Sequence, residues 1–268
     1  MTGVSSVWLD PLRTALDEGS PVPVAWFFRD DDAGWADDRL WPLIEVCAAA
    51  GATLDVAAIP EEVTPTTGAA LGRLAGEATI AIHQHGRSHV NHEATGRACE
   101  FGSARSADDQ AADLTVGRDI LEAAIGGPTT GVFVPPWNRC SEVTVGLLAE
   151  LGFAALSRDE SAFVTSFPEV RVCADWTRLT REGGLPALAG TLAGAVRRRA
   201  GGRAEDDRLT PAVGLMLHHA DLGAADLSGL AQLLDLVANH PGAECVPLAS
   251  LASTAGATQG AADDDSRT

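Results

Sequence analysis

The sequence predicts an α/β fold, a barrel of seven or eight parallel strands. Short β-branched or aromatic apolar runs recur along the chain, and a longer segment with helical periodicity follows most of them. An open doubly wound sheet usually has a glycine-rich phosphate turn after its first strand, whereas here Arg29-Asp30-Asp31-Asp32-Ala33-Gly34 follows. The count of βα units and this polar turn together favour the barrel.

Eight apolar runs of strand length alternate with six segments of helix length. The predicted strands are Val22–Phe28, Thr53–Ile59, Thr79–His83, Gly131–Val134, Phe153–Leu156, Val170–Cys173, Ala212–Leu217 and Glu244–Pro247. The predicted helices are Asp38–Ala50, Gly68–Ala75, Ala107–Ile125, Glu142–Leu151, Leu185–Arg199 and Leu227–Asn239. Ser141 and Asp226 are placed to cap two of these helices. We expect one domain over residues 1–252, with a loop at Gly201–Asp207 and a disordered acidic tail at 253–268.

The composition describes a globular chain with a strong negative charge. Of 268 residues, 46% are hydrophobic and 21% are charged, which is enough apolar material for a sizeable core. Nineteen Lys plus Arg against 37 Asp plus Glu give a formal charge of −18, which repels phosphate backbones and anionic membranes. We therefore expect no nucleic-acid and no membrane partner. The basic cluster Arg197-Arg198-Arg199 with Arg203 is interpreted as a solvated helix end.

The sequence also bears on the cell compartment. It contains no run of roughly 18 consecutive apolar residues, and Met1 to Gly19 have neither a basic region nor an apolar core. A cytoplasmic location is therefore expected. The five cysteines are odd in number, widely spaced and without a CxxC pair, so they indicate neither a disulfide framework nor a thiolate zinc site.

Polar residues gather where four of the predicted strands end. In a parallel barrel, functional groups lie just past the carboxyl ends of the strands, because the loops there vary while the barrel stays rigid. The four runs at such ends are Arg29 to Gly34, His83 to His92, Pro135-Pro136-Trp137-Asn138, and His218-His219. The sequence therefore predicts the functional site at this end of the barrel.

Six of the seven histidines lie in two of these runs, and their spacing suggests a metal site. His85 and His89 have the i, i+4 spacing that brings two imidazoles to one side of a helical turn. A carboxylate from another strand, Asp31 or Asp32, would complete a facial set suited to zinc or another divalent ion. His83 and His92 are interpreted as supporting or surface residues, and His240 as a structural residue at a helix end.

The strand pattern also suggests an acid and a base. Alternation along the first strand points Arg29 and Asp31 to one face and Asp30 and Asp32 to the other. One aspartate would bind the metal while a neighbour acts as base, and both Asp30 and Asp31 are candidates for the base. Of the two adjacent histidines, one should face the barrel axis as a catalytic residue while the other packs outward.

The order of these motifs resembles the polysaccharide deacetylases with the NodB homology domain, also called carbohydrate esterase family 4, over Val22 to Ala220. The resemblance implies a distorted (β/α) barrel with about seven parallel strands. Asp31-Asp32 before Gly34 is similar to the first motif, which makes Asp31 the general base and Asp32 a metal ligand. His85-Gly86-Arg87-Ser88-His89 is similar to the second motif, whose outer histidines bind the metal and whose Ser supports the loop.

Three further stretches resemble the remaining motifs. Phe133-Val134-Pro135-Pro136-Trp137 is similar to the third motif, which implies that Trp137, next to Pro136, lines the substrate groove and that its backbone N–H holds the oxyanion. Val134 stands where the family usually has the Arg that tethers the base, and Arg29 is our candidate to replace it. Asp175-Trp176 resembles the fourth motif, and Leu215 to His218 the fifth, which makes His218 the general acid and Asp175 its orienting partner. His219 stands where the family often has Asp.

The resemblance implies hydrolysis of an N-acetyl, or less often O-acetyl, group on a carbohydrate or glycosylated metabolite, with zinc as the expected divalent metal. The expected compartment favours an intracellular acetylated sugar, a glycolipid precursor or a glycosylated metabolite. Tryptophan rings near the motifs could stack on a sugar: Trp35, Trp41, Trp137 and Trp176. The alternatives are an amidohydrolase-like enzyme that uses the His83-Gln84-His85 pair, and a metal-retaining but inactive sugar-binding protein, suggested by Val134.

Overall fold

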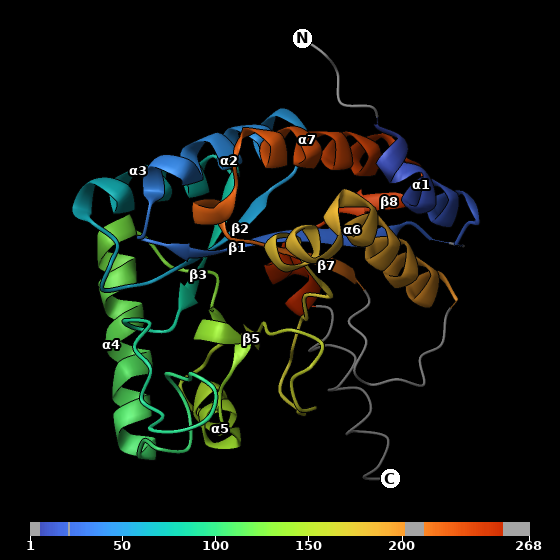
Figure 1. Cartoon of the computed structure of the whole chain (residues 1–268). Helices are drawn as coiled ribbons and strands as arrows, with labels where there is room; N and C mark the ends of the chain where they lie inside the picture. The colour runs from blue at the N-terminus through green and yellow to red at the C-terminus, as the bar shows by residue number, and fades with distance from the viewer. Residues whose placement is uncertain (1–5, 21, 202–211, 254–268) are drawn as a thin grey trace, which may run out of the picture.

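The computed structural model describes residues 6–20, 22–201 and 212–253, and within them the chain forms a curled parallel sheet surrounded by helices (Figure 1). Seven strands follow one path in the order β5-β4-β3-β2-β1-β7-β6, and β8 pairs with β1 beside it. Every strand pair is parallel. The predicted α/β class is confirmed, as a distorted (β/α) barrel with seven strands on its main path.

The elements alternate along the chain as the sequence predicts. The strands are β1 Val24–Ala33, β2 Leu54–Ala58, β3 Ile80–His85, β4 Val132–Val134, β5 Ala155–Leu156, β6 Ala174–Asp175, β7 Ala212–Leu217 and β8 Ala243–Cys245. The helices are α1 Asp10–Asp17, α2 Asp37–Ala49, α3 Pro65–Gly76, α4 Ala107–Ile125, α5 Glu142–Glu150, α6 Trp176–Ala200 and α7 Ala224–Asn239. Short 3-10 turns are η1 Ser6–Leu9, η2 Pro136–Asn138 and η3 His219–Asp221.

Strand β1 is an interior strand of the sheet, between β2 and β7, and carries the acidic run. It pairs with β2 along one edge and with β7 along the other, and its register with β2 shifts between Asp30 and Ala33. The strand continues five residues past the predicted end at Phe28, because its charged side chains are neutralised by buried partners instead of facing water. The backbone up to Asp30 is therefore fixed by ladder hydrogen bonds, and Asp31 and Asp32 lie at the irregularity that follows it.

The helices begin where local capping allows. Figure 1 shows α2, α3 and α7 along the top of the view, α4 and α5 at the lower left, and α1 beside α6 at the right. Ser106 and Ser141 accept the N–H groups of the third helical residues of α4 and α5, so the predicted cap at Ser141 is confirmed. Asp226 lies in the first turn of α7, two residues past its start, and accepts the Gly223 N–H and the indole N–H of Trp176.

Three elements differ from the prediction. Helix α1 was not predicted; it packs its apolar face against α6. Helix α6 begins at Trp176 instead of Leu185, with a break at Gly183 and Gly184 that hides its periodicity. The predicted strand 170–173 is a segment of isolated parallel bridges, Leu156 to Glu169 and Asp159 to Val172, which join the ends of the main strand path.

Three further predictions concern the acidic tail and the 201–207 loop, the cysteines and membrane-spanning segments. The tail at 254–268 and residues 202–207 of the predicted loop lie outside the described residues. All five cysteines are free thiols, in agreement with the sequence. In the part of the chain that the structure describes, no helix is long and apolar enough to cross a membrane.

Candidate metal centre and active site

The carboxyl ends of β1 and β3 bring three metal-ligating side chains together. Asp32 lies near the end of β1, His85 ends β3, and His89 follows in the next loop. The Asp32 Oδ1 atom is 3.2 Å from His85 Nε2 and 3.3 Å from His89 Nε2. The predicted helical turn between the histidines is wrong, because His85 is in a strand and His89 has a left-handed backbone with φ of 56°. The strand end and the loop converge nevertheless.

Asp32 Oδ1, His85 Nε2 and His89 Nε2 can each offer a lone pair to a shared cation. His85 Nδ1 lies 3.0 Å from the carbonyl oxygen of Val134, which can only accept, so Nδ1 carries the proton and Nε2 presents its lone pair. The Asp32 Oδ1 atom is buried without a hydrogen-bond donor. This donor set fits a divalent cation such as zinc.

The candidate base is held by a guanidinium from its own strand. Arg29 Nε donates to Asp31 Oδ1 at 2.8 Å, and Nη2 donates to Asp31 Oδ2 at 2.9 Å. Both side chains are buried, and Arg29 is 0% exposed. Its remaining hydrogens reach Ser157 at 2.9 Å and Asn138 at 2.6 Å. The predicted same-face placement of Arg29 and Asp31 is confirmed by these two hydrogen bonds.

Sequence reasoning did not assign roles to two of these partners. Asn138 was noted only as the end of the Pro-Pro-Trp run, yet its side-chain oxygen accepts from Arg29. Ser157 directly follows the predicted strand that ends at Leu156, so the strand-end rule that selected the other site residues could have found it.

Asp30 and His219 form a second buried pair behind the site. Asp30 Oδ1 accepts the backbone N–H of His219 at 2.8 Å, and Oδ2 lies 2.7 Å from His219 Nδ1. The other ring nitrogen lies 2.7 Å from the Trp35 carbonyl oxygen, so it must carry a proton. Desolvation lowers the pKa of His219, but the hydrogen bond and charge of Asp30 raise it by more, to about 9. Asp30 is thus committed to His219, which leaves Asp31 as the better candidate base.

This pair predicts that stability falls as the pH rises. An unfolded histidine titrates near ~6.5, so the contribution of His219 is complete below that pH and is lost as the pH rises through about 9. We expect metal-free protein to lose roughly 3 kcal/mol of unfolding free energy across this window, measured by urea denaturation. In His219→Gln the loss should be much smaller, whereas His240→Gln, at an exposed pair with Asp17, should keep it. An equal slope in His219→Gln would refute the assignment.

A pocket of about 630 Å³ is lined by Trp137, whose ring lies 4.3 Å from that of the candidate ligand His89. His218, Trp137 and Asp175 all line it, and so does Asn138. His218 is half-exposed to the pocket while His219 is buried, so the two histidines point in different directions, as predicted. The Asp175 carboxylate caps α6 by accepting the N–H of Arg178, and its orienting role toward His218 stays a prediction.

The predicted tryptophans divide into two groups. The ring of Trp137 lies 4.3 Å from that of His89, and the ring of Trp35, which is 38% exposed, lies 4.8 Å from it on another side. Trp176 is 0% exposed and packs against Trp8, so the expectation that it stacks on a sugar is wrong. Trp41 is partly buried against the core, away from the ring contacts of His89. Trp35 and Trp137 are therefore the stacking candidates next to His89.

Four site residues that are not glycine have a left-handed backbone. The φ angles are 74° at Asp32, 56° at His89, 57° at Trp137 and 58° at Asn138. Such angles cost about 1–3 kcal/mol each and persist only where the surrounding structure imposes them. Asp32 and His89 belong to the candidate ligand set, and Trp137 and Asn138 line the pocket, so this concentration of left-handed residues supports the interpretation of a functional site.

Comparison with known proteins agrees with this geometry at the level of the fold. No protein-family model matches the sequence, and no curated protein matches it. Solved structures do match. A Mycobacterium smegmatis protein assigned to the polysaccharide deacetylases has a TM-score of 0.61 at 16% identity, over 90% of this chain and 96% of its own. The family 4 carbohydrate esterase from Streptomyces lividans, in complex with acetate, has a TM-score of 0.52 at 13% identity, over 82% and 90%.

Another matching structure is a pseudoenzyme of the same family. The Bacillus anthracis protein BA3943 has a TM-score of 0.56 at 13% identity, over 87% of this chain and 67% of its own. The fold therefore occurs with and without activity, and function must be argued from the site. The chain has the fold of the family 4 carbohydrate esterases and polysaccharide deacetylases.

Proposed function

We propose that the protein is a metal-dependent deacetylase that hydrolyses an N-acetyl, or O-acetyl, group on a carbohydrate or glycosylated metabolite, with zinc as the metal. One observation carries the proposal. Asp32, His85 and His89 converge as lone-pair donors next to the tethered Asp31, and the Trp137 ring, 4.3 Å from that of His89, lines a pocket together with His218. The similar structures include a carbohydrate esterase and a protein assigned to the polysaccharide deacetylases, which supports acetylated sugars as the substrates. A cytoplasmic location stays a prediction from the sequence.

The residues supply the parts of an acyl-transfer reaction. A divalent ion on Asp32, His85 and His89 would polarise the acyl carbonyl and lower the pKa of water. Asp31, oriented by both hydrogen bonds from Arg29, accepts the proton of the attacking water. The backbone N–H of Trp137 donates to the developing oxyanion. His218 then protonates the departing amine, which completes the hydrolysis.

The inactive sugar-binding alternative is weakened by Arg29. Its motivation was Val134 in place of the tethering Arg, and Arg29 makes that tether from another direction. The amidohydrolase-like alternative needs His83 as a ligand. Both nitrogens of His83 are already engaged, 2.9 Å from Asp55 and 2.6 Å from Thr130, in a buried position. Neither alternative therefore accounts for the site as well as the deacetylase does.

Acetate release from a panel of acetylated mono- and oligosaccharides, in zinc-loaded protein, tests the proposal. We expect His218→Ala to lower the turnover number on the order of 10²-fold or more while the zinc content stays at the wild-type value, because His218 lies outside the ligand set. His240→Ala, at an exposed pair with Asp17, is the matched control and should change neither quantity. Unchanged turnover in His218→Ala on an accepted substrate would contradict the assignment.

A further inference from the structure

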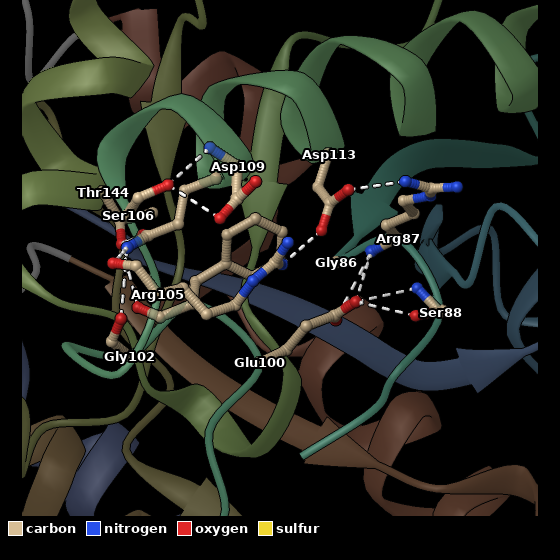
Figure 2. A network of polar contacts seen from close by, with 12 residues as sticks. Gly86, Arg87, Ser88, Glu100, Gly102, Arg105, Ser106, Asp109, Asp113 and Thr144 are labelled. Carbon is tan, nitrogen blue, oxygen red and sulfur yellow. Dashed lines mark hydrogen bonds and ion pairs between the residues drawn. The ribbon is translucent and has the colours of Figure 1, made fainter. Parts of the chain in front are cut away.

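The loop that carries His89 rests on a buried carboxylate, Glu100. Its side chain is 0% exposed, and Oε1 accepts the backbone N–H of Ser88 at 2.8 Å and of Arg87 at 3.2 Å. The Ser88 hydroxyl also donates to Oε1, at 3.2 Å (Figure 2). The two amides belong to consecutive residues between His85 and His89. One carboxylate thus fixes the chain between two metal-ligating side chains.

The contact between this loop and Glu100 leaves no free space. A Cβ atom on Gly86 would lie 2.1 Å from Glu100 Oε2 and 2.7 Å from the side chain of Pro136. Gly86 also has φ of 63°, which favours glycine. The loop backbone is therefore seated directly on the carboxylate and on the residue before Trp137.

The segment that contains Glu100 is bonded to the second loop of the site. The Ala98 carbonyl oxygen accepts from Arg139 Nη1 at 2.9 Å, and the Cys99 thiol donates to the Arg139 carbonyl at 3.4 Å. Phe101 forms a parallel bridge with Cys140. Because Arg139 closely follows Trp137, residues 98–101 link the metal-ligand loop to the predicted oxyanion and substrate loop.

The outer side of the metal-ligand loop is held by weaker contacts. The Arg87 guanidinium pairs with Glu61 at 2.8 Å and with Asp113 at 2.5 Å, and Asp113 also pairs with Arg105 (Figure 2). The Arg87 and Glu61 side chains are each about a third exposed, so solvent screens this pair. The buried hydrogen bonds to Glu100 are the ones that can fix the loop backbone.

We propose that Glu100 is a positioning residue for the metal centre. By fixing the amides of Arg87 and Ser88, it holds His89 in its left-handed conformation, so that Nε2 reaches Asp32 and His85. The inference rests on the proposed function, since it assumes that these three residues bind metal. Groups behind metal ligands of this kind typically change metal affinity by about 10- to 100-fold when they are removed.

The test is zinc affinity, measured by chelator competition, together with the visible spectrum of the cobalt-substituted protein. Glu100→Ala should weaken zinc binding about tenfold or more and shift the cobalt bands. Glu100→Asp, whose carboxylate is one methylene short of the two amides, should also weaken binding, and it is the variant to use if the alanine variant does not fold. Glu100→Gln should retain most of the affinity, because its side-chain oxygen can still accept from Ser88.

A matched control separates positioning from general stability. Glu169 is a nearly buried carboxylate that accepts from Arg158 and Arg171, away from the residue 86–89 loop. Glu169→Ala should lower the unfolding midpoint and leave zinc affinity unchanged. Wild-type affinity in Glu100→Ala and Glu100→Asp would overturn this inference alone, and so would equal weakening in Glu169→Ala. Wild-type protein that binds no zinc would overturn the proposed function itself.

Discussion

Replacing either Asp32 or His89 with alanine should empty the metal centre. We expect about one divalent ion per chain in the wild-type protein and close to none in either variant, because two remaining donors hold a catalytic metal poorly. Metal content measured by elemental analysis after dialysis, together with the shift in thermal unfolding on adding zinc, reports the result. Acetate release should fall to background in both variants.

The control for this experiment lies in the same histidine run. His92 is exposed and outside the set of converging ligands, so His92→Ala should keep the wild-type metal content. Full retention of metal in both Asp32→Ala and His89→Ala would reject the three-residue site. It would favour the amidohydrolase-like alternative, in which His83 binds the metal, although that imidazole is hydrogen-bonded to Asp55 and Thr130.

Arg29→Met should cost both stability and activity. The substitution leaves the buried Asp31 carboxylate without its two guanidinium hydrogen bonds. The side-chain oxygens of Asn138 and Ser157 also lose the hydrogen bonds that Arg29 donates to them. Breaking a buried pair by removing one partner costs about 3–5 kcal/mol, so urea denaturation should show a loss of that size. Turnover should fall on the order of 10²-fold, since the candidate base loses its orientation.

Two variants make this prediction specific. Arg158→Met removes another buried guanidinium, one that pairs with Glu169, and should reduce stability while leaving turnover intact. Arg29→Lys keeps the charge but not the two-pronged geometry, and should lie between wild type and Arg29→Met. Unchanged turnover in Arg29→Met would eliminate the tether hypothesis.

The barrel fold, and the position of the polar motifs at the ends of its strands, were predictable because the apolar runs have the length of strands and the periodic segments the length of helices. Helix α4 was predicted with the observed bounds, and β7 likewise. The C-terminal end of β1 was not predicted, because a run of one arginine and three aspartates has the composition of a solvated turn. Only tertiary partners, His219 for Asp30 and Arg29 for Asp31, make that run compatible with a buried strand.

The convergence of Asp32, His85 and His89 was predicted, but for a partly mistaken local reason. The i, i+4 spacing suggested a helical turn, whereas the rings meet because His85 ends a strand and His89 adopts a left-handed backbone. Glu100 could not be found from the sequence. It lies 12 residues from Ser88 along the chain and belongs to no recognisable pattern, so only the folded loop reveals its role.

The left-handed residues of the candidate site bear on how such a sequence changes over time. At Asp32, His89, Trp137 and Asn138 the mutation that best relieves backbone strain is to glycine, which deletes a candidate ligand, an aromatic ring or the amide that accepts from Arg29. Selection for stability and selection for chemistry are therefore opposed at these four positions, unlike in the apolar core, where both favour the same side chains. In related proteins that have lost the activity, these four residues should be the first to be replaced. Glycines at these positions in related sequences would mark vestigial sites.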